Sequence, residues 1–259
     1  MTPAPPSALE ASWNRFWFTP TRAAPLARVR ILAGLLGVAL TWTWLDDIVA
    51  WFGPEGMITP EVLEVWRSPT AVSLFDVVSS PALLRTLVLG GIVLFLLLAA
   101  GAGTPVVAPL AALFHASLLH RGPMLAGPAD DVLAVILWCL VVGRSGDDLS
   151  LDRWLSGTAT GPAASWRTRT ALGLLRVHAS AIAAAAVVSQ LKADVWWDGT
   201  AAGLLAAREG SIPGAASVLG TSTLLTNLAT HAITLFEIGF AVDRKSTRLN
   251  SSHEWISRM

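Results

Sequence analysis

Residues that could do chemistry gather shortly before position 200. Gln190, Lys192, Trp196, Trp197 and Asp198 lie close together in the chain. A partly buried lysine in such a cluster can act as a base or hold an anion, with the tryptophans as an aromatic platform. In the alternative interpretation the lysine extends to a membrane surface and pairs with a nearby aspartate, while the tryptophans anchor the chain at that surface.

A second group of polar residues borders apolar segments in the first half of the chain. Asp46-Asp47 and Asp130-Asp131 are two carboxylate pairs, and His120 precedes the second pair. Two such pairs at one surface could hold a cation with oxygen ligands. In the alternative, Asp130 is a helix N-cap and Asp131 a favourable charge at a helix start. No zinc-type spacing and no histidine pair at i, i+4 occurs, so we assign no metal site.

Glu237 is the most unusual ionisable residue, because it stands inside the apolar stretch 232–242. An ionisable side chain in such a segment must find a partner, become protonated or face a cavity. A structural pairing with a buried arginine, such as Arg30 or Arg176, and a role in catalysis or transport are both consistent with its position.

Long apolar segments must position these residues. Residues 86–119 contain no Asp, Glu, Lys or Arg, and the sequence Gly101-Ala102-Gly103-Thr104-Pro105 interrupts them as a turn. About 20 apolar residues cross the hydrocarbon core of a bilayer. The chain is therefore predicted to be an all-α integral membrane protein, a bundle of about six transmembrane helices. The predicted spans are residues 29–45, 86–100, 106–119, 132–142, 171–191 and 221–242.

Two segments outside the spans have a predicted structure of their own. Residues 60–66 form a short amphipathic piece that suits the membrane interface. Residues 144–176 are polar and read as a loop with room for one surface helix. Arg28 and Arg30, at the start of the first span, can extend back to the surface and need not weaken that span.

Composition supports a membrane protein. The chain is 53% hydrophobic and 14% charged, whereas about 25% of residues are charged in an average soluble domain. It has 12 Trp and no Tyr, and Trp favours the level of the lipid headgroups. Its net charge of zero argues against a nucleic-acid partner, so the bilayer is the expected partner. Cys139 lies in an apolar run and is interpreted as a small core residue.

The distribution of arginine predicts the orientation. With a cytoplasmic N-terminus and six spans, the N-terminal segment and residues 144–176 lie inside and together carry nine arginines. The segments then outside carry five basic residues: Arg67, Arg85, Arg121, Lys192 and Arg208. This excess of positive charge inside favours a plasma (inner) membrane protein with its N-terminus in the cytoplasm.

Residues 243–259 differ from the rest of the chain. They lose the apolar character and resemble a translated adapter or vector sequence; a short basic tail is the alternative. We therefore expect a membrane domain at residues 1–242, truncated at its C-terminus, followed by a non-native or disordered tail.

Several short motifs occur one after another along residues 13–242. They are Trp17-Phe18-x-Pro20, Ala27-x-x-Arg30-Ile31, Gly53-Pro54-x-Gly56, Ser150-Leu151-Asp152 and Trp196-Trp197-Asp198-Gly199-Thr200-Ala201, followed by Glu237. In order and spacing they resemble the horizontally transferred transmembrane (HTTM) domain, the membrane part shared with vitamin K-dependent gamma-carboxylase.

The resemblance implies a multi-helix membrane domain and, in the carboxylase, a catalytic site open to the non-cytoplasmic side. There a lysine acts as base toward reduced vitamin K, about nine residues before the glycine of the last motif. In this chain that position is Gln190. An amide cannot accept a proton as a base does, and Lys192 could serve only with a shift of register. A reduced quinone such as vitamin K is expected as a cofactor only through this resemblance.

Three functions are therefore open. The first is an enzyme with an outward-facing site, carboxylase-like in architecture but without the carboxylase base. The second is a transporter for a small solute or ion, and the third a non-catalytic membrane module that recruits an unidentified protein partner. The catalytic candidates are Lys192, Gln190 and His120, and the substrate-binding candidates are Asp130, Asp131, Trp196, Trp197, Asp198 and Glu237.

Overall fold

The chain folds into helices. A computed structural model describes residues 7–78, 80–157, 164–208 and 214–242; within them no strand occurs, and the one β-bridge joins Thr21 to Ser165. The predicted all-α class is therefore confirmed for this part of the chain. Residues 243–259, expected to be a foreign or disordered tail, lie outside the described residues. The chain divides into two units, Met1–Leu175 and Arg176–Met259.

The first unit contains four long helices. They are α2 (Ala24–Trp42), α5 (Pro81–Ala100), α6 (Thr104–Arg121) and α7 (Pro128–Val142). Shorter elements connect them: α1 (Ala8–Trp17), α3 (Trp44–Phe52), α4 (Pro60–Trp66), η1 (Leu74–Asp76), η2 (Pro123–Leu125), η3 (Ser145–Asp147) and α8 (Leu151–Ser156). The first four predicted spans are thus helices, and the amphipathic piece at residues 60–66 is α4.

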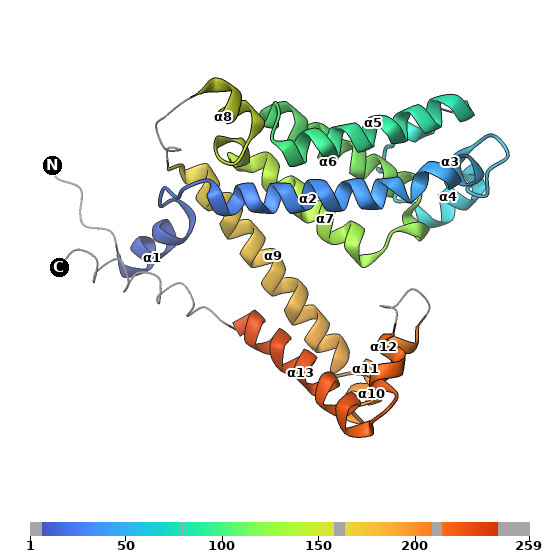
Figure 1. The fold of residues 1–259 in the computed structure, drawn as a ribbon, viewed down its shortest axis with the longest axis vertical. Helices are drawn as coiled ribbons and strands as arrows, with labels where there is room; N and C mark the ends of the chain where they lie inside the picture. Colours follow the sequence, from blue (N-terminus) through green and yellow to red (C-terminus); the bar gives the residue numbers. More distant parts are fainter. Residues whose placement is uncertain (1–6, 79, 158–163, 209–213, 243–259) are drawn as a thin grey trace. The chain divides into compact units, whose positions relative to one another are not determined.

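The centre of this unit is the pair formed by α2 and α5, which lie side by side (Figure 1). Small residues permit their close approach. A Cβ atom at Gly34 would lie 2.7 Å from the Cβ of Ala99, and one at Gly37 would overlap the Phe95 ring. Close packing through small residues is the usual way in which membrane helices associate.

The turn predicted between the second and third spans is present. Gly101 ends α5 in the left-handed region at φ 75°, and its N–H donates to the carbonyl of Leu97 at 2.9 Å. Gly103 is also left-handed, at φ 55°, directly before α6. Two glycines in this conformation reverse the chain at little steric cost, which is why α6 folds back against α5.

The second unit begins within α9 (Trp166–Gln190), whose residues up to Leu175 belong to the first unit. It continues with α10 (Asp194–Trp197), α11 (Ala201–Ala207), α12 (Ala215–Leu219) and α13 (Thr223–Val242). Thr230 on α13 is fully buried, and its hydroxyl accepts the N–H of Ala202 at 3.0 Å. This bond joins α13 to α11.

Three helices are long and apolar enough to cross a membrane: α2, α5 and α9. The helices α6, α7 and α13 match the other predicted spans in position but are not among these three. The 15 residues of α7, for example, extend over about 22 Å, short of a hydrocarbon core of roughly 30 Å.

The predicted loop at residues 144–176 is shorter than expected. It contains η3 and the one surface helix, α8, but α9 already begins at Trp166. The polar start of α9 is helical because it packs within the first unit. Thr168 is fully buried, the Nε of Arg169 donates to the Phe16 carbonyl at 2.8 Å, and the hydroxyl of Thr170 donates to the Trp17 carbonyl at 3.0 Å.

Candidate functional site

Two predicted site residues meet in the second unit. The Nε2 of Gln190, the last residue of α9, donates to Oε2 of Glu237 on α13 at 2.6 Å. The hydroxyl of Thr234, one turn before Glu237, donates to Oε1 of Gln190 at 2.8 Å. Gln190 is buried and Glu237 half-buried. The amide is therefore held from both sides, and it orients the carboxyl group in turn.

The partner of Glu237 differs from the buried arginine considered above. Within the ranges that the structure describes, Glu237 makes no ion pair, since the two ion pairs found there are Arg67–Asp76 and Arg144–Asp147. Its hydrogen bond comes from a neutral amide instead. The site can consequently lose or gain a proton at only one group, the carboxyl of Glu237.

The contact also fixes where Glu237 lies relative to the end of α9. Gln190 ends α9, whereas Glu237 is about 21 Å along α13 from Thr223. In a tight hairpin of two spanning helices the end of the first would meet the start of the second. Here the end of α9 meets the later part of α13, because α10, α11 and α12 are inserted between them. Glu237 is thus level with the end of α9 and not deep beside its middle.

The other residues of the predicted cluster are mostly exposed. Lys192 and Asp198 are exposed, and no ion pair joins them or Asp194 in the described part of the chain. Trp197 is 65% exposed, and its indole N–H donates to the carbonyl of Leu191 at 3.0 Å, while Trp196 is half-buried. This geometry provides an exposed aromatic and charged rim beside the pair of buried Gln190 and half-buried Glu237.

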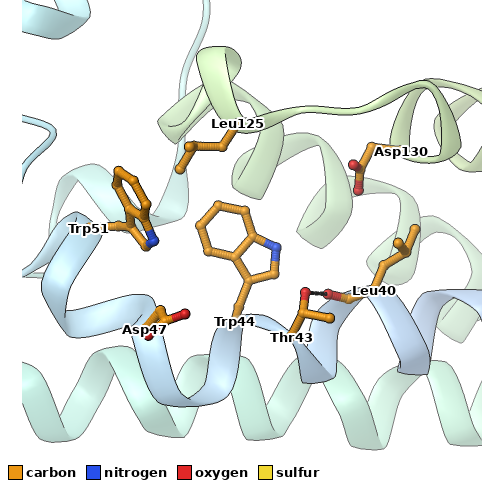
Figure 2. Close-up of a pocket in the computed structure, with 7 residues that line it drawn as sticks. All are labelled: Leu40, Thr43, Trp44, Asp47, Trp51, Leu125 and Asp130. Carbon is orange, nitrogen blue, oxygen red and sulfur yellow. Dashed lines mark hydrogen bonds between the residues drawn. The ribbon is translucent and has the colours of Figure 1, made fainter. Parts of the chain in front are cut away.

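One residue of each carboxylate pair in the first half of the chain lines a cavity in the first unit. The cavity has a volume of about 210 Å³ and lies between α3, the end of α2 and the start of α7 (Figure 2). Asp47 and Asp130 line it, one from each pair, together with Trp44 and Trp51. Among the described residues, no three His, Cys, Asp or Glu side chains are arranged to hold a metal ion.

Asp130 does not take the N-cap position considered for it. It is the third residue of α7, and its Oδ2 accepts the N–H of Gly127 at 2.9 Å. The main-chain oxygen of Asp130 accepts a hydrogen bond from Nε2 of the buried His115, also at 2.9 Å. Asp131 is exposed, as expected for a charge at a helix start.

His120 is exposed, and its Nδ1 bonds the carbonyl oxygen of Val72 at 2.9 Å. His120, Asp130 and Asp131 belong to the first unit, whereas Gln190, Lys192 and Glu237 belong to the second. The structure therefore yields two separate candidate sites.

A third polar centre, not predicted from the sequence, surrounds Arg30. Extension of Arg30 to the surface and a buried pairing with Glu237 were both considered; the side chain is fully buried. Its guanidinium donates to the carbonyls of Ser145 and Leu149, each at 2.5 Å, and to that of Asp148 at 3.3 Å. These three carbonyls belong to one bend of the chain, which the arginine holds together.

The motif Ser150-Leu151-Asp152 and the glycine turn before α6 join this centre. The hydroxyl of Ser150 donates to the Gly146 carbonyl at 2.6 Å, and Oδ2 of Asp152 accepts the N–H of Gly103 at 2.7 Å. Two motifs far apart in sequence, one containing Arg30 and one containing Ser150 and Asp152, thus meet at the turn between α5 and α6. Their joint occurrence was the only sequence signal for this centre, and it is consistent with a structural role.

No family model, no curated protein and no solved structure matches this chain. The relation to the HTTM domain therefore stays a prediction from the motifs.

Proposed function

We propose that the chain is a multi-pass integral membrane enzyme of the HTTM type, and that Glu237 is the acid–base group of a site at the outer end of α9. In this proposal α2, α5, α6, α7 and α9 form the membrane domain of a plasma membrane protein, with a cytoplasmic N-terminus. The three helices that are apolar and long enough to cross a membrane support it. So does the excess of arginine in the segments assigned to the cytoplasm.

One observation carries the assignment of Glu237: the 2.6 Å hydrogen bond from Gln190. The family pattern places a basic lysine where this chain has Gln190. The amide cannot take a proton, but the carboxyl group that it orients can. A proton-accepting atom is thereby supplied beside the position of the missing base, from α13 instead of α9.

The lysine chemistry of the carboxylase does not fit these residues. Neither Gln190 nor Thr234 has a basic atom, and Lys192 is exposed, with no hydrogen bond or ion pair to the Gln190–Glu237 pair. We therefore derive no step through a reduced quinone. The reaction proposed is general acid–base catalysis: Glu237 removes a proton from a lipid-soluble substrate and returns a proton to it.

Exchange of hydrogen with solvent tests this reaction without knowledge of the substrate. The protein in nanodiscs is incubated in D₂O with a lipid extract of its source, and mass spectrometry measures deuterium bound to carbon in lipid-soluble compounds. Wild-type protein should label one compound, and Glu237→Gln should lower the rate by about 10²–10⁴-fold, the usual contribution of a general base. Glu64→Gln, at an exposed carboxylate of α4, is the matched control and should keep the wild-type rate.

Three outcomes would contradict the proposal. Equal labelling by wild type and Glu237→Gln would remove Glu237 from the chemistry, and absence of labelling by wild type would argue against proton abstraction. Loss of labelling in Lys192→Ala but not in Glu237→Gln would make the lysine the base. If labelling is absent while Glu237 is needed for proton flux into liposomes, the transporter alternative replaces the enzyme.

A further inference from the structure

The cavity of the first unit carries negative charge that no protein cation balances. Among the residues that the structure describes, neither Asp47 nor Asp130 has a Lys, Arg or His nitrogen within 4.0 Å. Asp130 uses one carboxylate oxygen to accept the N–H of Gly127, and Asp47 is exposed. The first turns of α3 and α7 supply only partial positive charge to these two carboxylates, so a cationic ligand in the cavity is favourable.

The volume of the cavity indicates how large this cationic ligand can be. The cavity volume of about 210 Å³ is far more than a bare metal ion needs. Two carboxylates also provide fewer oxygen ligands than calcium requires. An organic cation therefore fits this cavity better than a metal ion.

Aromatic rings complete the lining. Figure 2 shows the indole of Trp44 in the middle of the cavity wall, between Trp51 and Asp130. The Trp44 ring packs on Phe52 at 5.3 Å between centroids, and Phe52 packs on the buried Phe75 at 5.8 Å. The wall is therefore held by the core of the unit. Tryptophan faces are the best aromatic partners for cations, and quaternary ammonium groups are recognised in this way.

The cavity lies where a lipid headgroup is within reach. Helix α2 is one of the three helices able to cross a membrane; it ends at Trp42, directly before the cavity residues Thr43 and Trp44. Trp42 is 61% exposed, and exposed tryptophans at the end of a span favour the headgroup level.

We propose that this cavity binds an organic ammonium group, with Asp47 and Asp130 as its counter-charges and Trp44 and Trp51 as its aromatic walls. The ligand chemistry is that of a choline or ethanolamine headgroup. This site is independent of Glu237, so the two proposals can fail separately.

Choline binding tests the charge and the shape of the site. Isothermal titration of the protein in detergent micelles should show saturable binding of choline and of tetramethylammonium. The neutral isostere 3,3-dimethyl-1-butanol should not bind, because it has the same shape without the charge. Asp47→Asn and Trp44→Leu should weaken choline binding by about tenfold or more.

The chain offers a matched control for the first variant. Asp46 is adjacent to Asp47, carries the same charge and is exposed, but it does not line the cavity. Asp46→Asn should therefore bind choline as wild type does. Equal weakening by Asp46→Asn and Asp47→Asn, or equal binding of choline and its neutral isostere, would overturn the proposal, as would absence of choline binding in both micelles and nanodiscs.

Nanodiscs of two compositions distinguish the sources of the ammonium group. If the ligand is a lipid headgroup, free choline should bind in phosphatidylglycerol nanodiscs and be displaced in phosphatidylcholine nanodiscs. If the ligand is a soluble amine, choline should bind equally in both. Either result supports an ammonium site and names its source.

Discussion

The two units of the chain bury their apolar residues to very different degrees. In the first unit, Phe52, Phe75 and Phe95 are at most 2% exposed. In the second unit, large apolar side chains of α13 face outward: Leu228 is 60% and Phe236 73% exposed. The most apolar window of α9 is only 11% buried, whereas those of α2 and α5 are 39% and 33% buried.

This difference indicates what stabilises each unit. The first unit has a core of its own, which contains packed phenylalanine rings and the buried Arg30 centre. We therefore expect its stability to depend on packing within the chain. The second unit exposes an apolar area that a protein in water rarely leaves uncovered. Its stability should therefore depend on the hydrocarbon of the bilayer and on the few polar contacts that fix α13.

The largest effect is expected at Arg30. Arg30→Ala leaves three carbonyls of residues 145–149 without their charged donor, and it should lower the free energy of unfolding by about 3–5 kcal/mol. Denaturation in detergent micelles, followed by circular dichroism, measures this loss. Arg28→Ala is the matched control, because Arg28 lies on the same helix and is exposed. Equal stability of the two variants would show that the bend does not depend on Arg30.

A pair of phenylalanine variants tests the contrast between the units directly. Phe75 is 1% exposed and lies between Phe52 and Phe114, with centroid distances of 5.8 and 6.0 Å. Phe75→Ala should cost about 3 kcal/mol through the cavity that it leaves. Phe236→Ala should change the stability by less than about 0.5 kcal/mol. A comparable loss in both variants would mean that the exposed face of α13 is covered by protein.

A smaller and more local effect is expected at Thr230. Thr230→Val keeps the shape but removes the acceptor of the buried Ala202 N–H, which should cost about 1–3 kcal/mol. Hydrogen exchange should then be faster at the Ala202 amide than in wild type. Thr223→Val, at the exposed start of α13, should leave that amide protected. Unchanged protection in Thr230→Val would disprove the role of this bond.

The smallest effect concerns the first helix. Hydrogen bonds from the main chain and the side chain of Ser7 hold the pKa of the Glu10 carboxyl below its usual value. Because the pKa is lowered in the folded state, this stabilisation is present above the unfolded pKa and is lost as the pH falls through the folded one. Ser7→Ala should raise the pKa of Glu10, as measured by NMR titration. An unchanged value would show that the cap does not form.

Much of the fold follows from the sequence. Six apolar segments, a Gly-rich turn and the short piece at residues 60–66 predict the six long helices, the reversal at Gly101 and α4. The early start of α9 could not be predicted, because residues such as Thr168 become helical through contacts with segments far away in the sequence. The burial of Arg30 could not be predicted for the same reason. Its partners are main-chain carbonyls, which cannot be identified from residue types.

The candidate sites were predictable only in part. Gln190 and Glu237 were each identified as candidates, but their contact was not predicted. It depends on how far α10–α12 displace the start of α13, which cannot be read from the apolar segments. The two carboxylate pairs were expected near one surface, and Asp47 and Asp130 do line one cavity. The contribution of Trp51 to that cavity was not foreseen, because it depends on the break between α2 and α3.

The central claim is that α9 crosses the membrane and brings the Gln190–Glu237 pair to its outer face. Cysteine labelling on both sides of α9 tests it most directly, with Ser156→Cys before the helix and Thr200→Cys after it, each in a Cys139→Ala background. Both positions are exposed. In intact cells a membrane-impermeant maleimide should label the cysteine at position 200 and leave that at position 156 unlabelled until the cells are lysed. Labelling of both positions from the same side would contradict the account.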